Sequence, residues 1–150
     1  MDYTVKVWSV ATKSLVSDCG TRGNTDPSIG HTHFVYAVAA MPDGQRILSG
    51  SKDKTVRVWL LNGTHQNTFH QLNIGWVHAL VALPDNQHAL AGGNDIKLFN
   101  VNDGAVLRTF THHTHSVTSL ALLPDGLRFV SGSGDCTARI AYHGLAPLAV

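Results

Sequence analysis

Histidine is unusually frequent in this chain, with ten copies among 150 residues. The stretches "GHTHFV" and "HHTHSV" place His31 and His33, and likewise His113 and His115, two positions apart. On an extended strand this spacing points both rings to one face, where they could bind zinc or copper. No Cys or carboxylate stands at metal-ligand spacing beside them. The pattern therefore predicts no metal site and no cofactor.

A second group has the composition of a hydrolytic triad, namely His31, either Ser49 or Ser51, and Asp53. A nucleophilic serine needs a sharp exposed turn and an oxyanion hole, and no GxSxG sequence is present. The two serines instead lie in "SGS", in an expected strand where small residues let neighbouring sheets approach. We therefore predict a protein that is not an enzyme and has no small-molecule substrate.

The overall charge excludes some partners. Eleven basic and ten acidic side chains give a net charge of +1, and Lys and Arg do not cluster, so nucleic acid is not expected as a partner. No charged start precedes an apolar run, and no apolar stretch approaches about 18 residues, so neither secretion nor membrane binding is expected.

Cys19 and Cys136 lack CxxC spacing and are predicted to be free thiols, with a long-range disulfide as the alternative. We expect an intracellular protein, cytoplasmic by default, with the nucleus left open.

A turn sequence recurs along the chain, and its spacing shows which elements hold these residues. It is "MPDG" at Met41–Gly44, "LPDN" at Leu83–Asn86 and "LPDG" at Leu123–Gly126, so its prolines lie 42 and 40 residues apart. A fixed period of this size indicates structural repeats. Pro followed by Asp and then Gly or Asn is typical of a tight type I turn between two strands.

Short strand patterns surround each turn. "FVYAVAA", "WVHALVA" and "SVTSLAL" precede the three turns, and each turn is followed by two further strand patterns such as "QRILSGS" and "TVRVW". A weaker strand near Leu15–Ser17, Thr64–Phe69 and Val106–Phe110 would begin each unit and complete four antiparallel strands. With the opening strand at Tyr3–Trp8, the sequence predicts thirteen strands and an all-β fold.

The repeated unit identifies a family. The stretch "GHTHFVYAVAAMPDGQRILSGSKDKTVRVW" at Gly30–Trp59 resembles a WD40 repeat of a β-propeller, in its Gly-His pair, its PDG turn, its "SGSKDKT" run and its closing Trp. The resemblance covers nearly the whole chain and implies a single partial propeller over residues 1–150. We expect an orphan last strand at 1–8, blades at 9–59, 60–99 and 100–142, and a tail at 143–150.

The resemblance also implies a structural hydrogen-bond network in each blade. In the second unit it would join His31, Ser49 or Ser51, Asp53 and Trp59, since Trp donates, Asp accepts and His does both. The third unit has Asn73 at the position of His31 and Phe99 at that of Trp59. The fourth unit keeps the polar members, which are His113, Ser131 or Ser133, and Asp135. It has Ala141 at the Trp position, so only one network is expected to be complete.

Three blades cannot close the six- to eight-bladed ring that the resemblance implies. The sheet faces at the two ends of the arc should therefore be exposed, and exposed apolar faces of that size call for a partner. Two explanations stay open, a homodimeric ring and a segment of a longer propeller.

The loop rim is the expected contact surface. Trp76 stands where Phe34 and Ser116 stand in the other units, at the entry of the first strand, and rim aromatics are common interface anchors. The predicted partner-binding residues are His33, Phe34, Tyr36, Lys52, Trp76, His78, Asn94, His115 and Ser116. The loop from Ser17 to Gly30 is longer than its counterparts, and recognition and disorder remain equal alternatives for it.

The resemblance implies a non-catalytic scaffold that binds a peptide or a folded protein on this rim. The alternative is a structural segment that completes a ring or a larger assembly through its open blade ends, as a homodimer or within a larger complex.

Overall fold

The computed structural model describes residues 3–20, 28 and 30–146, and these contain thirteen strands and no helix. No segment of this part of the chain forms a helix that could cross a membrane. The strands are β1 (Val5–Ser9), β2 (Ser14–Cys19), β3 (Val35–Ala40), β4 (Arg46–Ser51), β5 (Val56–Leu60), β6 (His65–Phe69), β7 (Ala79–Ala82), β8 (His88–Gly92), β9 (Ile96–Asn100), β10 (Val106–Phe110), β11 (Val117–Leu122), β12 (Arg128–Ser133) and β13 (Ala138–Tyr142). Much of the predicted long loop, the first two residues and the last four of the predicted tail lie outside the described residues.

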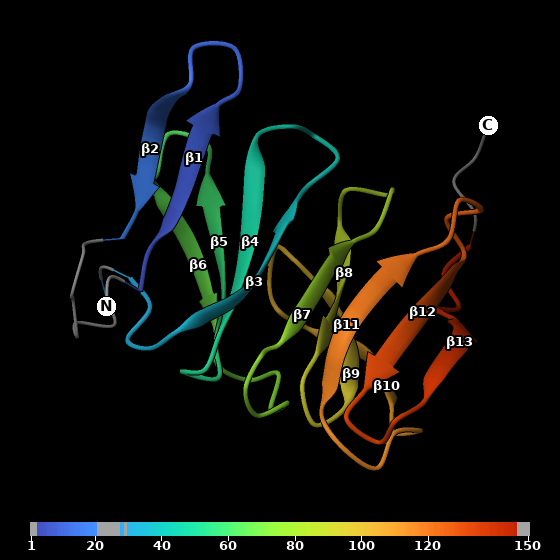
Figure 1. Cartoon of the computed structure of the whole chain (residues 1–150). Helices are drawn as coiled ribbons and strands as arrows, with labels where there is room; N and C mark the ends of the chain where they lie inside the picture. The colour runs from blue at the N-terminus through green and yellow to red at the C-terminus, as the bar shows by residue number, and fades with distance from the viewer. Residues whose placement is uncertain (1–2, 21–27, 29, 147–150) are drawn as a thin grey trace.

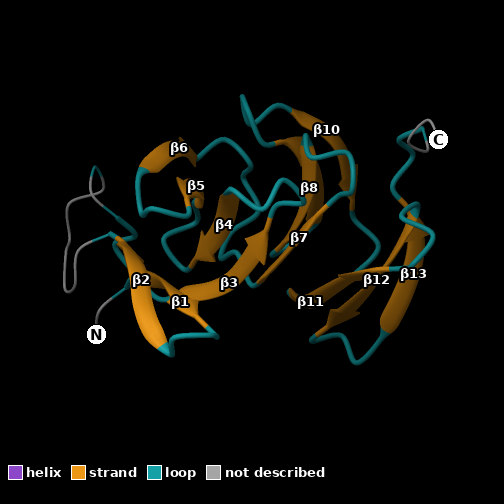
Figure 2. Cartoon of the chain, turned by 90° about the horizontal axis from the view of Figure 1, so that it is seen from above, coloured by secondary structure: helices purple, strands orange, loops and turns teal. Residues whose placement is uncertain are grey.

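The strands form four antiparallel sheets that stand side by side in an open arc from β1–β2 to β11–β13 (Figures 1 and 2). Two sheets have four strands, in the orders β3-β4-β5-β6 and β7-β8-β9-β10, while β1–β2 has two strands and β11–β13 has three. The predicted all-β architecture of propeller blades that do not close a ring is confirmed.

The grouping of strands into sheets differs from the predicted units. Each weaker strand was expected to begin a unit, but β2, β6 and β10 pair with the strand before them, β1, β5 and β9. The reason is the length of the connections, because β5 and β6 are joined by the four residues 61–64 and β6 and β7 by the nine residues 70–78. Short links form hairpins, whereas the longer link crosses to the next sheet.

The three repeated turns have the predicted geometry. The amide of the fourth residue donates to the carbonyl of the first at 3.1 Å in Met41–Gly44, 3.3 Å in Leu83–Asn86 and 2.9 Å in Leu123–Gly126. The fourth residue has a φ of +65°, +59° and +68° respectively, which explains why only Gly and Asn occur there. Each turn thus fixes the register of the first two strands of its sheet.

The hydrophobic core lies between the sheets and has three parts. The largest joins β3–β6 to β7–β10 and includes Leu48, Val58, Leu80 and Phe99. The second lies between β7–β10 and β11–β13, and the third packs β1–β2 on β3–β6 around Trp59. Because each sheet contacts only its neighbours, the outer faces of the two end sheets have no sheet packed on them among the described residues.

Candidate functional site

The predicted network of the second unit is present in sheet β3–β6. His31 Nδ1 lies 2.8 Å from Asp53 Oδ2, and His31 Nε2 lies 2.7 Å from Ser49 Oγ. The indole of Trp59 donates to the same Ser49 Oγ at 2.8 Å. Of the two serines left open by the sequence, Ser49 is the one that joins, while Ser51 donates to the carbonyl of His33. The four side chains tie the loop before β3 to strands β4 and β5.

The electrostatics of this network support a structural role. Burial raises the pKa of Asp53, but hydrogen bonds and charge from His31, together with bonds from Thr55 and the Thr32 amide, hold it far below its usual range. Ionised Asp53 then keeps a proton on His31 Nδ1, so His31 Nε2 accepts from the Ser49 hydroxyl. Ser49 is completely buried, and its hydroxyl is already bonded on both sides.

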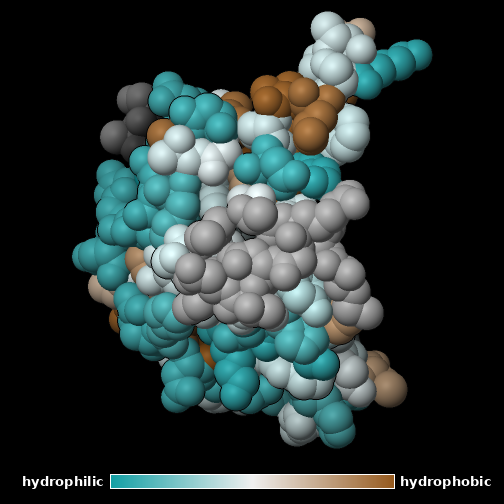
Figure 3. Space-filling view, turned by 90° about the vertical axis from the view of Figure 1, so that its left-hand side faces the viewer, coloured by the Kyte–Doolittle hydropathy of each residue, from teal (hydrophilic) through white to brown (hydrophobic). Residues whose placement is uncertain are grey.

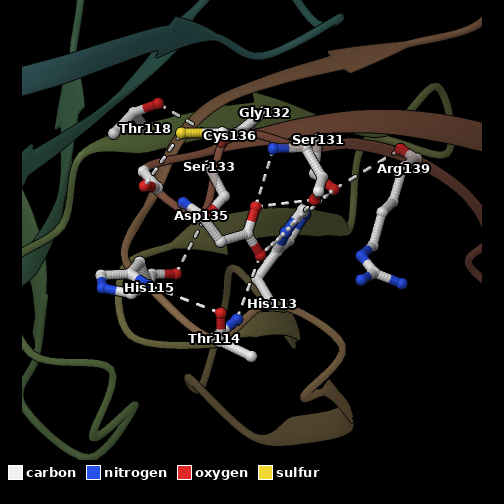
Figure 4. A network of polar contacts seen from close by, with 12 residues as sticks. His113, Thr114, His115, Thr118, Ser131, Gly132, Ser133, Asp135, Cys136 and Arg139 are labelled. Atoms are coloured by element: carbon white, nitrogen blue, oxygen red, sulfur yellow. Dashed lines mark hydrogen bonds and ion pairs between the residues drawn. The ribbon is translucent and has the colours of Figure 1, made fainter.

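Figure 4 shows the corresponding network of the last sheet. His113 Nδ1 lies 2.8 Å from Asp135 Oδ2, and His113 Nε2 lies 2.8 Å from Ser131 Oγ. Ser133 donates to the carbonyl of His115 instead, as Ser51 does to His33. Bonds from Thr137, His113 and nearby amides hold the pKa of Asp135 below its usual range, although desolvation raises it. Ala141 supplies no indole, so this network has three of the four members.

Sheet β7–β10 replaces the network with close backbone contacts. Asn73 is exposed at the position of His31, and Phe99 is buried at that of Trp59. A Cβ on Gly93 would lie 2.2 Å from the Ile74 carbonyl oxygen and 2.6 Å from that of Trp76. Glycine therefore lets the loop before β7 contact the β8–β9 link directly.

Most of the predicted contact residues form one continuous surface, which we call the aromatic rim: His33, Phe34, Tyr36, Lys52, Trp76 and His78. Lys52 joins the two sheets, because its Nζ lies 4.4 Å from the centroid of the Trp76 ring and 5.7 Å from that of Phe34. These are cation–π distances. The amide of Lys52 also donates to the Phe34 carbonyl, which holds the β4–β5 link against the entry of β3.

The second half of the rim consists of three rings in contact, Tyr36, His78 and Trp76. Tyr36 on β3 stacks on His78 at 4.9 Å between centroids, and His78 meets the edge of Trp76 at 6.1 Å. Burial lowers the pKa of His78, so its ring is neutral at pH 7. Tyr36 and Trp76 remain 42% and 44% exposed, which leaves much of both rings free for a partner.

Sequence reasoning missed one member of this surface, and three of the predicted contact residues make no ring contact with it among the described residues. The ring of Tyr3 meets Phe34 edge-on at 5.9 Å, and only its place in the first repeat could have suggested this. Asn94 lies in the β8–β9 link beside the rim, where its amide donates to the Ile74 carbonyl at 2.7 Å, while His115 and Ser116 lie at the entry of β11. No ring contact joins them to the rim within the described part of the chain.

In each histidine pair, the two rings have different partners. "GHTHF" forms a bend before β3 rather than a strand, so His31 is buried and bonded to Asp53, while the His33 ring lies tilted against Phe34 at 4.8 Å between centroids. Across the described ranges, no three His, Cys, Asp or Glu side chains come together in a group that could hold a metal ion. Cys19 is buried and Cys136 exposed, and both are free thiols.

Comparison with known protein families gives a match on the repeats. The family model described as "WD domain, G-beta repeat" matches residues 25–59 and 104–140. These segments contain the two networks that keep His, Ser and Asp. Strands β7–β9 of the intervening sheet, which lacks such a network, fall outside the match, whereas its fourth strand β10 lies within the second segment.

Several curated proteins are similar to the chain. A small ribosomal subunit protein RACK1 from Caenorhabditis elegans is 47% identical over 62 residues, covering 41% of this chain and 19% of that protein. Pre-mRNA-processing factor 17 from Saccharomyces cerevisiae is 30% identical over 144 residues, covering 93% of this chain and 30% of that protein. A Lissencephaly-1 homolog from Caenorhabditis briggsae is 30% identical over 105 residues, covering 68% and 27%. The chain thus spans less than a third of the length of each of these relatives.

Proposed function

Because the chain belongs to the WD40-repeat family, we propose that it is a non-catalytic protein-binding scaffold that holds a peptide or a folded protein on its aromatic rim. The main support is the exposed aromatic surface at the junction of β3–β6 and β7–β10, where Trp76 and Tyr36 keep more than two fifths of their area exposed. Aromatic side chains held rigidly at a surface are the usual source of binding energy at protein interfaces. We further propose an intracellular location.

The buried networks support the non-catalytic part of this proposal. A nucleophilic serine must be reached by its substrate, whereas Ser49 is completely buried and bonded to Trp59 and His31. The same His, Ser and Asp arrangement occurs in two sheets, where it ties a loop to two strands. We therefore attribute the repeated arrangement to stabilisation of the fold rather than to catalysis.

The rim can be tested with peptides selected on the immobilised chain from a displayed random library. The double variant Phe34→Ala/Trp76→Ala should bind the selected peptides at least about tenfold more weakly, because both rings contact a bound partner. The matched control is Trp8→Ala, since Trp8 is 59% exposed but lies on β1, away from the rim. Unchanged binding by the folded double variant, as judged by circular dichroism, would rule out the rim.

A second candidate function is assembly through the end sheets. Six large apolar side chains are exposed on β1–β2, its turn and β13: Trp8, Val10, Leu15, Val16, Ile140 and Tyr142. In the space-filling view of the β1–β2 side, however, hydrophobic atoms gather near the upper edge and most of the visible described surface is polar (Figure 3).

A further inference from the structure

The two networks that keep His, Ser and Asp are copies of one arrangement at a constant distance in the sequence. Each member in β3–β6 lies 82 residues before its counterpart in the last sheet. The pairs are His31 with His113, Ser49 with Ser131, Asp53 with Asp135, Arg57 with Arg139 and Trp59 with Ala141. Strand pairing agrees, since Ile47 faces Trp59 across β4 and β5 as Phe129 faces Ala141 across β12 and β13. The first copy therefore shows what the second lacks.

The missing group is an indole that donates a hydrogen bond. Ser49 Oγ accepts from the Trp59 indole at 2.8 Å while it donates to His31. Ser131 has the same partner on one side, with His113 Nε2 at 2.8 Å, and its other contact is the Arg139 carbonyl at 3.5 Å, which is itself an acceptor. Ser131 is buried, with only 2% of its surface exposed. Among the described residues, no group donates a hydrogen bond to its Oγ. A buried oxygen in this state favours a ligand with an N–H group.

A cavity of about 260 Å³ lies at this place, between β9–β10 and β12–β13. Its floor is apolar and buried, formed by Ile96, Phe110 and Phe129, and Ser131 and Ala141 also line it. Ile140 on β13 also lines the cavity and is 64% exposed. In the first copy, Trp59 occupies the equivalent space and is 1% exposed.

Two phenylalanines compensate in part for the lost indole. Phe110 pairs with Ile96 as Cys19 pairs with Val5, and Phe129 stands in the place of Ile47, so each is larger than its counterpart. Their rings meet edge-to-face at 5.1 Å. The cavity persists beside them and presents an aromatic wall.

We propose that this cavity binds an indole ring, which donates its N–H to Ser131 Oγ and packs on Phe110 and Phe129. Size allows it, because an apolar cavity of about 150 Å³ can hold benzene and this one is larger. In the first copy the guanidinium of Arg57, the counterpart of Arg139, lies 6.0 Å from the Trp59 ring, which is a cation–π distance. The ring can come from a small molecule or from a Trp side chain of a polypeptide. This inference does not depend on the aromatic rim.

The test is a titration of the full chain with indole, followed by nuclear magnetic resonance and calorimetry. We expect saturable binding at one site, with 1-methylindole binding about five- to tenfold more weakly because it has no N–H to donate. Ser131→Ala should remove the difference between the two ligands. The matched control Ser133→Ala should keep it, because Ser133 is absent from the lining of the cavity. Absence of saturable indole binding, or equal affinity of wild type for both ligands, would overturn the proposal.

Supplying the ring covalently gives a second readout. In Ala141→Trp the new indole should fill the cavity, abolish binding of free indole and raise the thermal unfolding midpoint. Unchanged indole binding by a folded Ala141→Trp chain would place the ligand elsewhere and contradict the proposal. If this variant does not fold, the comparison of indole with 1-methylindole on the wild type still decides.

Short peptides distinguish the two sources of the ring. Tighter binding by a Trp-containing hexapeptide than by indole, and loss of binding when its Trp is replaced by Ala, would support a polypeptide ligand. Binding of indole with exclusion of the peptide would support a small molecule. Binding of neither would refute the site.

Discussion

Single side chains at equivalent positions make the three junctions between sheets different. In the three larger sheets, the third strand presents Trp59, Phe99 or Ala141 to the junction. Only Trp59 combines filling of space with a hydrogen bond to a buried oxygen. The junction of Ala141 depends on Phe110 and Phe129 for its packing, and among the described residues no group donates to Ser131 in place of the indole.

Truncation of Trp59 separates these two contributions. Trp59→Phe should destabilise the fold by about 1–2 kcal/mol, because the Ser49 hydroxyl loses its donor while most of the volume is kept. Trp59→Ala should cost about 3–5 kcal/mol, because a fully buried ring is removed. Urea unfolding measures both, and Trp8→Ala on the exposed face of β1 should stay within about 0.5 kcal/mol. Equal costs for the Phe and Ala variants would show that the hydrogen bond, rather than packing, dominates.

The turn carboxylate of Asp43 makes stability depend on pH in the acid range. Burial raises the pKa of Asp43, but hydrogen bonds from the Gln45 and Arg46 amides and from the Arg46 guanidinium lower it more strongly, to about 2. An unfolded Asp has a pKa of about 3.9, so ionised Asp43 stabilises the fold above about pH 4, and this contribution is lost as the pH falls toward 2. Asp43→Asn should therefore lose less stability than wild type between pH 4 and 2 in urea unfolding. An identical slope in both chains would contradict this.

The sequence could not decide whether Ser49 or Ser51 bonds to His31. The two serines are two apart on β4, so they lie on the same face and the alternation of side chains cannot distinguish them. The position of the His31 ring decides, and it depends on the bend before β3. The contact of Tyr3 with Phe34 is a similar case, because it depends on how the first sheet packs on the second.

At the scale of elements, backbone contact replaces side-chain bonding in sheet β7–β10, and Gly93→Ala tests it. The added Cβ would meet the Ile74 carbonyl oxygen at 2.2 Å, and backbone cannot move aside easily, so we expect a loss of about 2–4 kcal/mol in urea unfolding. The matched control is Gly134→Ala in the β12–β13 link, where the nearest atom would lie at 3.6 Å. Equal effects at the two glycines would show that this contact is not specific to β7–β10.

Strands and turns were predictable because both have local signatures. Short strand patterns mark the strands of the three units, and PDG or PDN marks the turn between the first two strands of each sheet. The pairing partner of each weaker strand was not predictable from the repeat. The repeat period is the same whether the boundary between units is placed before or after that strand. Only the lengths of the links, four residues against nine, indicate that β6 belongs with β5.

At the scale of the whole molecule, the arc separates three kinds of surface. The aromatic rim lies at the junction of the two four-stranded sheets, where packing on both sides holds its rings. The indole cavity lies at the junction of β7–β10 with β11–β13. The two end sheets carry exposed apolar side chains, and each packs on only one other described sheet. A variant in one region should therefore leave the other two unchanged.

Self-association tests this separation. Two copies that meet through their end sheets should give a species of twice 16.1 kDa in light scattering, because the exposed apolar side chains of both ends would then be covered. Val16→Glu/Ile140→Glu places charges on both ends and should leave only the monomer. Trp76→Glu on the rim is the control and should keep the dimer. A wild-type monomer at every concentration would exclude pairing of copies through the end sheets, whereas loss of the dimer in Trp76→Glu would show that the rim itself is the contact between copies.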